Sequence, residues 1–266
     1  MIQEILYLWA VKTTIQSLSI VGFGNVGSHL AEEFNRQGIQ VSHIYTRREE
    51  IVRELTSAYR PTLVENLRDL PKDQLVILCV PDAIIGELLL EIPANCPVAY
   101  TSGSTEIDSL PKRDRLGVFY PLQTFSQGVP VNLFEVPFFI ESKNSDFALA
   151  LFDLAWKISH KVTYASSEER KHLHLAAVWV NNFTNHMNHI AHSYLDSKGL
   201  DYDHLKPLLS ETAKKLQTAS AYDAQTGPAR RNDLLTIESH LSELSGDQRE
   251  MYRLISKSIQ DTYSND

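Results

Sequence analysis

Short apolar runs alternate with helix-like stretches along the first part of the chain. Several of these runs are rich in β-branched residues, as buried parallel strands are. The runs lie at 15–21, 39–45, 75–80, 98–101, 116–125 and 136–142. Strands that alternate with helices predict a doubly wound, mostly parallel α/β sheet. We therefore predict a Rossmann domain over residues 1–164, with 1–14 as an extension of uncertain role.

After residue 164 the strand signals stop, and the rest of the chain has only helical patterns. Ser166 and Glu169 form a capping-box pattern at the start of a long helix, and Gly199 is placed to end it. Residues 165–266 are therefore predicted to form an all-helical domain that serves dimerisation and substrate binding.

The long helix has one apolar face and one unusual polar face. The apolar face is predicted to hold Leu173, Ala176, Ala177, Val180, Phe183, Met187, Ile190, Ala191 and Tyr194. The other carries His174, Asn181, Asn182, Asn185, His186, Asn188, His189 and His192, with no charged residue from His172 to Leu195. A neutral polar face indicates partial burial. It is either an Asn/His network between helices or subunits, or the wall of a substrate cleft.

The first strand leads into a glycine pattern, Gly22-x-Gly24-x-x-Gly27, and then into a helix and a second strand. In this context the glycines allow a tight turn, close approach to a pyrophosphate and close helix–strand packing. The alternative is a Rossmann-like domain that has lost its ligand. Predicted cofactor contacts in the loop are Gly22, Phe23, Gly24, Asn25, Val26 and Gly27. Val80, Pro81, Ser102 and Gly103 follow other strands at the same sheet edge.

The end of the second strand indicates which dinucleotide binds. An acidic residue there would hold the ribose of NAD. The chain instead has Thr46, Arg47 and Arg48, which suit the 2′-phosphate of NADP. The alternative is that the arginines begin a solvated helix next to Glu49 and Glu50.

Composition limits the class of protein. The net charge of −8 makes a non-specific grip on nucleic acid unexpected. Two cysteines exclude a disulfide framework and fit a reducing compartment, so we expect a cytoplasmic protein. No apolar run is long enough to predict a membrane span. His186 and His189 have metal-ligand spacing, but no cysteine or carboxylate accompanies them, and no metal is expected.

A further cluster, Arg230, Arg231 and Asp233, is predicted in the opening turns of a helix that follows Thr226-Gly227-Pro228. It is either a capped helix with solvated arginines, or a site that holds an anionic substrate or the cofactor phosphates.

Several motifs together resemble those of bacterial Rossmann-like proteins with a C-terminal domain of unknown function, which are related to pyrroline-5-carboxylate reductase, prephenate dehydrogenase and deazaflavin-linked NADP reductases. These motifs are VGFGNVGSHLA (21–31), VPD (80–82), TSG (101–103), PLQTF (121–125), HLAAVWVNNFTNH (174–186) and TGPARRND (226–233). The resemblance implies NADP binding, a helical domain like that of 6-phosphogluconate dehydrogenase and a homodimer through it. Tyr100 and Tyr120 stand where the family pattern usually has histidine.

We therefore expect an NADP-dependent oxidoreductase that transfers hydride to or from a small molecule such as an imine or a 2-oxo acid. The protein must orient the substrate and move a proton, and histidine does this best near neutral pH. His174 and His186 are predicted as acid/base groups, Asn182 as the orienting group and Ser102 as a neighbour of the nicotinamide. The alternative is a regulatory or redox-sensing dimer that binds NADP without turnover.

Overall fold

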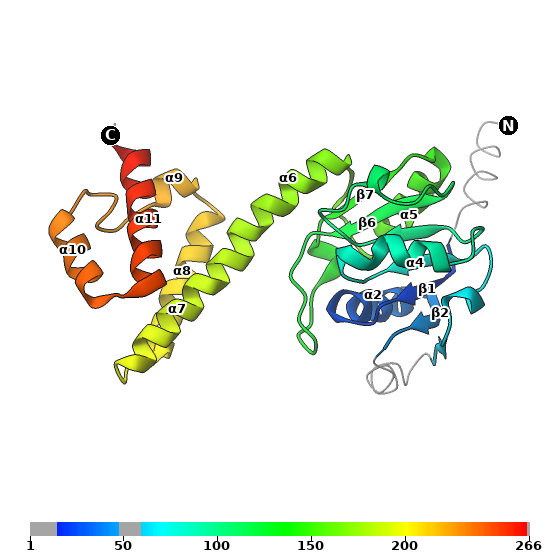
Figure 1. Ribbon diagram of the computed structural model, residues 1–266, viewed down its shortest axis with the longest axis horizontal. Coiled ribbons are helices and arrows are strands. Elements are labelled where there is room, and N and C mark those ends of the chain that lie inside the picture. Colours follow the sequence, from blue (N-terminus) through cyan, green and yellow to red (C-terminus); the bar gives the residue numbers. More distant parts are fainter. Residues whose placement is uncertain (1–14, 48–59, 265–266) are drawn as a thin grey trace. The chain divides into compact units, whose positions relative to one another are not determined.

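The computed structural model in Figure 1 describes residues 15–47 and 60–264. The chain divides into two compact units, Met1–Asn181 and Asn182–Asp266. The first holds the sheet and the second is helical. No helix among the described residues combines the length and the hydropathy needed to cross a membrane.

The first unit is built on one eight-stranded sheet with the strand order β3-β2-β1-β4-β5-β6-β7-β8. Its strands are β1 Ser17–Val21, β2 Gln40–Tyr45, β3 Thr62–Leu63, β4 Leu75–Leu78, β5 Val98–Tyr100, β6 Leu116–Pro121, β7 Phe138–Ser142 and β8 Val162–Tyr164. All neighbours are parallel except β6 and β7, which are antiparallel. The predicted mostly parallel, doubly wound sheet is confirmed.

Helices cover both faces of this sheet. On one face α2 (Asn25–Arg36) and α5 (Ser145–Trp156) pack in the apolar cluster that includes Leu30, Phe34 and Phe119. On the other face α4 (Ile85–Glu91) packs against the alternate side chains of the central strands, in the cluster that includes Tyr100. The central strands read as unbroken apolar runs because both of their faces are buried.

The two edge strands β3 and β8 were not predicted. They have two and three residues, and their side chains are half-buried or exposed. Strands so short show no hydrophobic periodicity, and their pairing depends on the neighbouring strands. The shorter helices are η1 Leu67–Asp69, η2 Asp82–Ile84, η3 Ile107–Ser109, η4 Leu133–Glu135 and η6 Tyr202–Leu205.

The long helix begins as predicted, because the Ser166 hydroxyl accepts from the Glu169 N–H and the Glu169 carboxylate accepts from the Ser166 N–H. It ends before Gly199, whose φ of 70° suits glycine. The prediction of one uninterrupted α-helix is wrong, however. α6 (Ser167–Ala177) and α7 (Thr184–Ser197) are joined by a π-helical stretch, η5 (Val178–Phe183). The wider π turn changes the register, so a single helical wheel does not relate His174 to His186.

The units divide within this helix, whereas the sequence predicted a domain boundary at 164/165. The reason is that the first turns of α6 bond to the sheet unit: the Ser167 hydroxyl donates to Glu141, and Arg170 donates to the carbonyl of Ser102. These polar contacts leave no sign in the hydrophobic pattern.

The second unit continues with α8 (Lys206–Leu216), α9 (Ala221–Ala224), α10 (Leu234–Glu243) and α11 (Gly246–Tyr263). The helix predicted to begin near Pro228 begins later, at Leu234. Asp233 is its N-cap and accepts from the Thr236 N–H. Arg230 and Arg231 therefore precede the helix rather than lying in its opening turns.

Candidate functional site

The glycine loop between β1 and α2 has the close packing that the sequence predicted. Gly22 has a φ of 92°, and a Cβ there would lie 2.3 Å from the Cys79 carbonyl oxygen. A Cβ on Gly27 would lie 2.1 Å from the Gly22 carbonyl oxygen. Gly22 also donates its N–H to the Tyr45 carbonyl at 2.9 Å. The loop thus packs tightly against the carboxyl ends of β1, β2 and β4. Only glycine fits at positions 22 and 27.

The N-terminus of α2 fits a dinucleotide phosphate. Its N-cap, Gly24, supplies no capping side chain, and its first turn carries no acidic residue. A Cβ on Gly24 would meet no atom within 4 Å, so open space lies in front of the helix. Helix N–H groups and the helix dipole favour an anion at such a place. Of the other predicted loop contacts, Phe23 is buried, while Asn25 and Val26 lie in the first turn.

A segment that follows β6 in the chain also contacts helix α2. The Asn25 side-chain amide donates to the Phe125 carbonyl at 2.9 Å, and His29 Nε2 lies 2.9 Å from the Val129 carbonyl. The segment after β6, which includes the PLQTF motif, thus fixes the helix that begins at the glycine loop. Sequence reasoning did not predict this contact, which joins residues 100 positions apart.

The residues predicted to select NADP follow β2. Thr46 is half-buried and Arg47 is exposed, directly after Tyr45, whose carbonyl binds the glycine loop. Arg48 lies outside the described residues. No acidic side chain occupies positions 45–47.

The loop after β5 is held tightly by its own residues. The Ser102 hydroxyl donates to the Thr105 hydroxyl at 2.9 Å and accepts from the N–H groups of Ser104 and Thr105. Ser102 is 6% exposed. Its hydroxyl therefore orders the loop, and its predicted place beside the nicotinamide stays a prediction.

Arg170 anchors this loop and was missed by the sequence reasoning. It is fully buried on α6, forms an ion pair with Glu141, and donates to the carbonyls of Ser102 and Thr105. A buried guanidinium that satisfies several acceptors sets the loop in one position. An arginine in an otherwise solvated first turn looks unremarkable in sequence, and only its burial identifies it.

Tyr120 and His174 meet beside this loop. The Tyr120 hydroxyl and His174 Nδ1 share a hydrogen bond of 3.0 Å. A Cβ on Gly103 would lie 2.7 Å from Tyr120 Cζ and 2.8 Å from His174 Nδ1. Burial raises the pKa of the Tyr120 phenol to about 12, so the phenol stays neutral and is able to donate to or accept from the imidazole. Tyr100, the other tyrosine in a family histidine position, is fully buried and donates to the Thr105 carbonyl.

A cavity of about 790 Å³ lies against the start of α6. It is lined by Ser104, Glu106, Ser167, Glu168, Lys171, His172, His174, Leu175 and Val178. His174 therefore has Tyr120 on one side and this cavity on the other. The position of the histidine suits a group that exchanges protons with a small molecule.

The other predicted site residues lie in the second unit. Asn182 and His186 are both exposed, in η5 and α7. Their predicted catalytic roles stay predictions. The Arg230 guanidinium lies 4.1 Å from the centre of the Tyr263 ring, a cation–π contact within the second unit.

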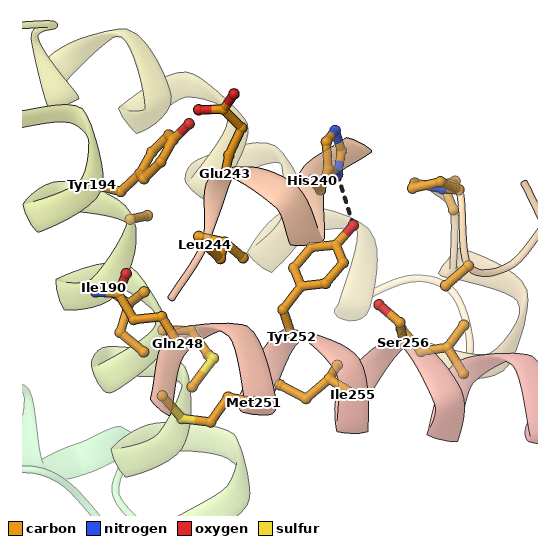
Figure 2. A pocket seen from close by; sticks show the side chains of 16 residues that line it. Ile190, Tyr194, His240, Glu243, Leu244, Gln248, Met251, Tyr252, Ile255 and Ser256 are labelled. Carbon is orange, nitrogen blue, oxygen red and sulfur yellow. Dashed lines mark hydrogen bonds between the residues drawn. The ribbon is translucent and has the colours of Figure 1, made fainter. Parts of the chain in front are cut away.

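The second unit has a cavity of its own, of about 530 Å³, between α7, α10 and α11 (Figure 2). Most of its wall is apolar, with Ile190, Leu244, Met251 and Ile255 among the lining residues. Its polar groups are already paired in part: His240 Nδ1 and the Tyr252 hydroxyl lie 2.7 Å apart, and Glu243 binds Lys198.

Two family models match the chain. Residues 17–98 match the family described as NADP oxidoreductase, coenzyme F420-dependent, and residues 136–259 match a domain of unknown function, DUF2520. The crystal structure of a Bacteroides fragilis protein named as an NADP oxidoreductase has 34% identity, with a TM-score of 0.83. The alignment covers 92% of this chain and 98% of that one. The chain belongs to the same NADP oxidoreductase family as this Bacteroides fragilis protein. The resemblance predicted from the motifs is confirmed.

More distant structures share the fold. An imine reductase from Myxococcus stipitatus in complex with NADP+ has 13% identity and a TM-score of 0.60, with 93% of each chain covered. A reductive aminase from Aspergillus terreus in complex with NADPH and ethyl levulinate has 15% identity and a TM-score of 0.60, covering 93% of this chain and 95% of that one. A search of curated protein sequences finds no significant match. Membership of the NADP oxidoreductase family supports the cofactor predicted from the glycine loop and Arg47.

Proposed function

We propose that the protein is an NADP-dependent oxidoreductase that transfers hydride between the cofactor and a small molecule with a C=N or C=O group. The observation that carries this proposal is the hydrogen bond between Tyr120 and His174 beside Gly103. Gly103 follows the carboxyl end of β5, and the glycine loop follows the carboxyl end of β1 in the same parallel sheet. This hydrogen bond places a proton-transferring pair near the carboxyl edge of the sheet, where ligands of doubly wound sheets bind.

The residues divide the work as follows. The nicotinamide supplies or accepts the hydride when NADP is bound. Gly22, Gly24 and the α2 N-terminus hold the pyrophosphate, and Arg47 holds the 2′-phosphate. His174, as the imidazolium, gives its Nε2 proton to the substrate nitrogen or oxygen, and Tyr120 orients the ring by accepting from Nδ1–H. Arg170 and Ser102 keep the intervening loop in place.

Hydride transfer is tested by following NADPH absorbance with the purified protein and a panel of cyclic imines, ketones and 2-oxo acids. Consumption of NADPH with one class, and transfer of deuterium from C4-deuterated NADPH to the product, are the expected results. Tight NADPH binding without turnover of any class would favour the regulatory alternative.

Arg47→Ala is expected to weaken NADPH binding about tenfold and to leave NADH binding unchanged, because only the phosphate loses a charged partner. Titration of protein fluorescence measures both affinities. Arg36→Ala, at the other end of α2, is the control and is expected to bind both cofactors like the wild type. An NADPH preference that survives the combined Arg47→Ala and Arg48→Ala change would contradict the assignment.

The second unit supports a homodimer through the helical domain. Among its described residues the buried apolar core consists of Ala229, Ile237 and Leu241. Large apolar side chains are exposed instead, among them Phe183, Leu208, Leu216, Leu254 and Ile255. So small a core does not offset the entropy of folding, and an apolar surface of this kind is normally covered. A second copy would cover it together with the apolar cavity of Figure 2.

Light scattering at micromolar concentration is therefore expected to give twice the 30.2 kDa mass of the chain. Leu254→Asp with Ile255→Asp is expected to shift the species toward the monomer, because each charge would be buried at the interface. Leu90→Asp, an exposed leucine of the sheet unit, is the matched control and is expected to leave the mass unchanged. A wild-type monomer would contradict the proposal.

A further inference from the structure

Asp82 is a charged residue at the candidate site that the proposed function leaves without a role. It follows β4 at the edge where the strands end, and it begins the short helix η2. The Ser104 hydroxyl donates to its carboxylate, so Asp82 is tied to the loop that carries Ser102 and Gly103. The carboxylate remains exposed on its other side.

Asp82 also acts on the proton-transferring pair. Burial is the largest cause of the raised pKa of the Tyr120 phenol; the Arg170 guanidinium lowers that pKa, and the Asp82 carboxylate raises it by less. The Ser104 hydroxyl joins this carboxylate to the loop whose Gly103 lies against Tyr120 and His174, so the carboxylate influences charge that develops there. A carboxylate there stabilises a cation and destabilises an anion.

The residues that line the cavity beside His174 carry a net negative charge, like Asp82. Two carboxylates, Glu106 and Glu168, line it, against one lysine, Lys171. Lys171 already pairs with Glu106 at 3.3 Å. The nearby guanidinium of Arg170 is fully buried and occupied by Glu141 and backbone carbonyls. A 2-oxo acid would thus meet negative charge, with the nearest cations already paired.

We propose that the substrate is an imine that reacts as its protonated cation, and that the Asp82 carboxylate selects it over a 2-oxo acid. This inference rests on the proposed hydride transfer. His174 protonates the imine nitrogen, and Asp82 stabilises the resulting positive charge. The hydride from NADPH then forms the new C–H bond at the imine carbon, while the C=N π pair moves to nitrogen. The imidazolium loses one proton and NADPH loses one hydride, so the products are a neutral amine, NADP+ and neutral His174, which regains its proton from solvent.

The test compares wild type with Asp82→Asn in two measurements. Calorimetry with the NADP+ complex measures the affinity for pyrrolidine, a cation at neutral pH, and for pyruvate. NADPH absorbance measures turnover of 1-pyrroline and of pyruvate. Wild type is expected to bind pyrrolidine and reduce 1-pyrroline. Asp82→Asn is expected to weaken pyrrolidine binding and to lower kcat/KM for 1-pyrroline about tenfold or more, with pyruvate affinity unchanged or improved.

Glu87→Gln is the matched control, since it removes one exposed carboxylate from the adjoining helix α4 and is expected to behave like wild type in both measurements. Wild type that fails to bind pyrrolidine, or binds it equally well after Asp82→Asn, overturns the inference. Turnover of pyruvate but not of 1-pyrroline also overturns it and leaves hydride transfer standing. Pyrrolidine binding that depends on Asp82, without turnover, supports the cation site and counts against the proposed oxidoreductase.

Discussion

Gly24→Ala is expected to weaken NADPH binding by about tenfold to a hundredfold while leaving the thermal stability of the protein unchanged. A Cβ at this position meets no protein atom within 4 Å, and the φ of −90° suits alanine. The added methyl group therefore has no effect on the fold. It does occupy the space through which a pyrophosphate reaches the N–H groups of α2, where charge-assisted hydrogen bonds are lost.

Gly27→Ala provides the contrast, because its Cβ would lie 2.1 Å from the Gly22 carbonyl. It should lose NADPH binding and also about 1–3 kcal/mol or more of stability, since backbone must shift. Gly86→Ala in α4 is the control, with only ordinary contacts at 3.8 Å, and should bind normally. Fluorescence titration and thermal unfolding measure the two effects. Unchanged NADPH affinity in Gly24→Ala would place the cofactor elsewhere.

His174→Gln is expected to lower kcat for NADPH-dependent reduction by about a hundredfold to ten-thousandfold, the usual contribution of a general acid. NADPH affinity should stay within a few-fold, because the residue acts on the substrate side. Tyr120→Phe removes the hydrogen bond to Nδ1 but keeps the ring, so a smaller loss is expected, together with a changed pH profile.

The matched control is His160→Gln, an exposed histidine before β8 that packs on Phe134. Its activity should equal that of wild type. Equal activity of His174→Gln and His160→Gln would remove His174 from the mechanism. In that case Asn182 and His186, the other residues predicted for catalysis, would be the next to substitute.

The sheet was largely predictable because its central strands are buried on both faces. The residues of β1 and β4 are almost all buried, and the glycines between β1 and α2 mark a loop that must approach a strand closely. The start of α6 and the end of α7 were also predictable, because the Ser166 cap and Gly199 act on residues close to them in sequence. The short edge strands had too few residues to show a period.

The helical part was harder to predict. The pattern over α6 and α7 suggested one amphipathic helix, but Val180 is 76% exposed and Phe183 is 44% exposed. In a unit with so small a core, the sequence alone does not indicate which surface covers these apolar residues. The π-helical turn at η5 changes the register without an obvious marker such as proline.

The sequence by itself determined the strand–loop–helix–strand unit, the glycine loop and the polar end of β2, because each depends on residues close together in the chain. Only the tertiary structure decided the site around His174. Arg170 binds Ser102 across 68 positions, Tyr120 meets His174 across 54, and Asp82 holds Ser104 across 22. Such contacts depend on which strand ends share one edge, and that order is set by packing of the whole sheet rather than by any local pattern.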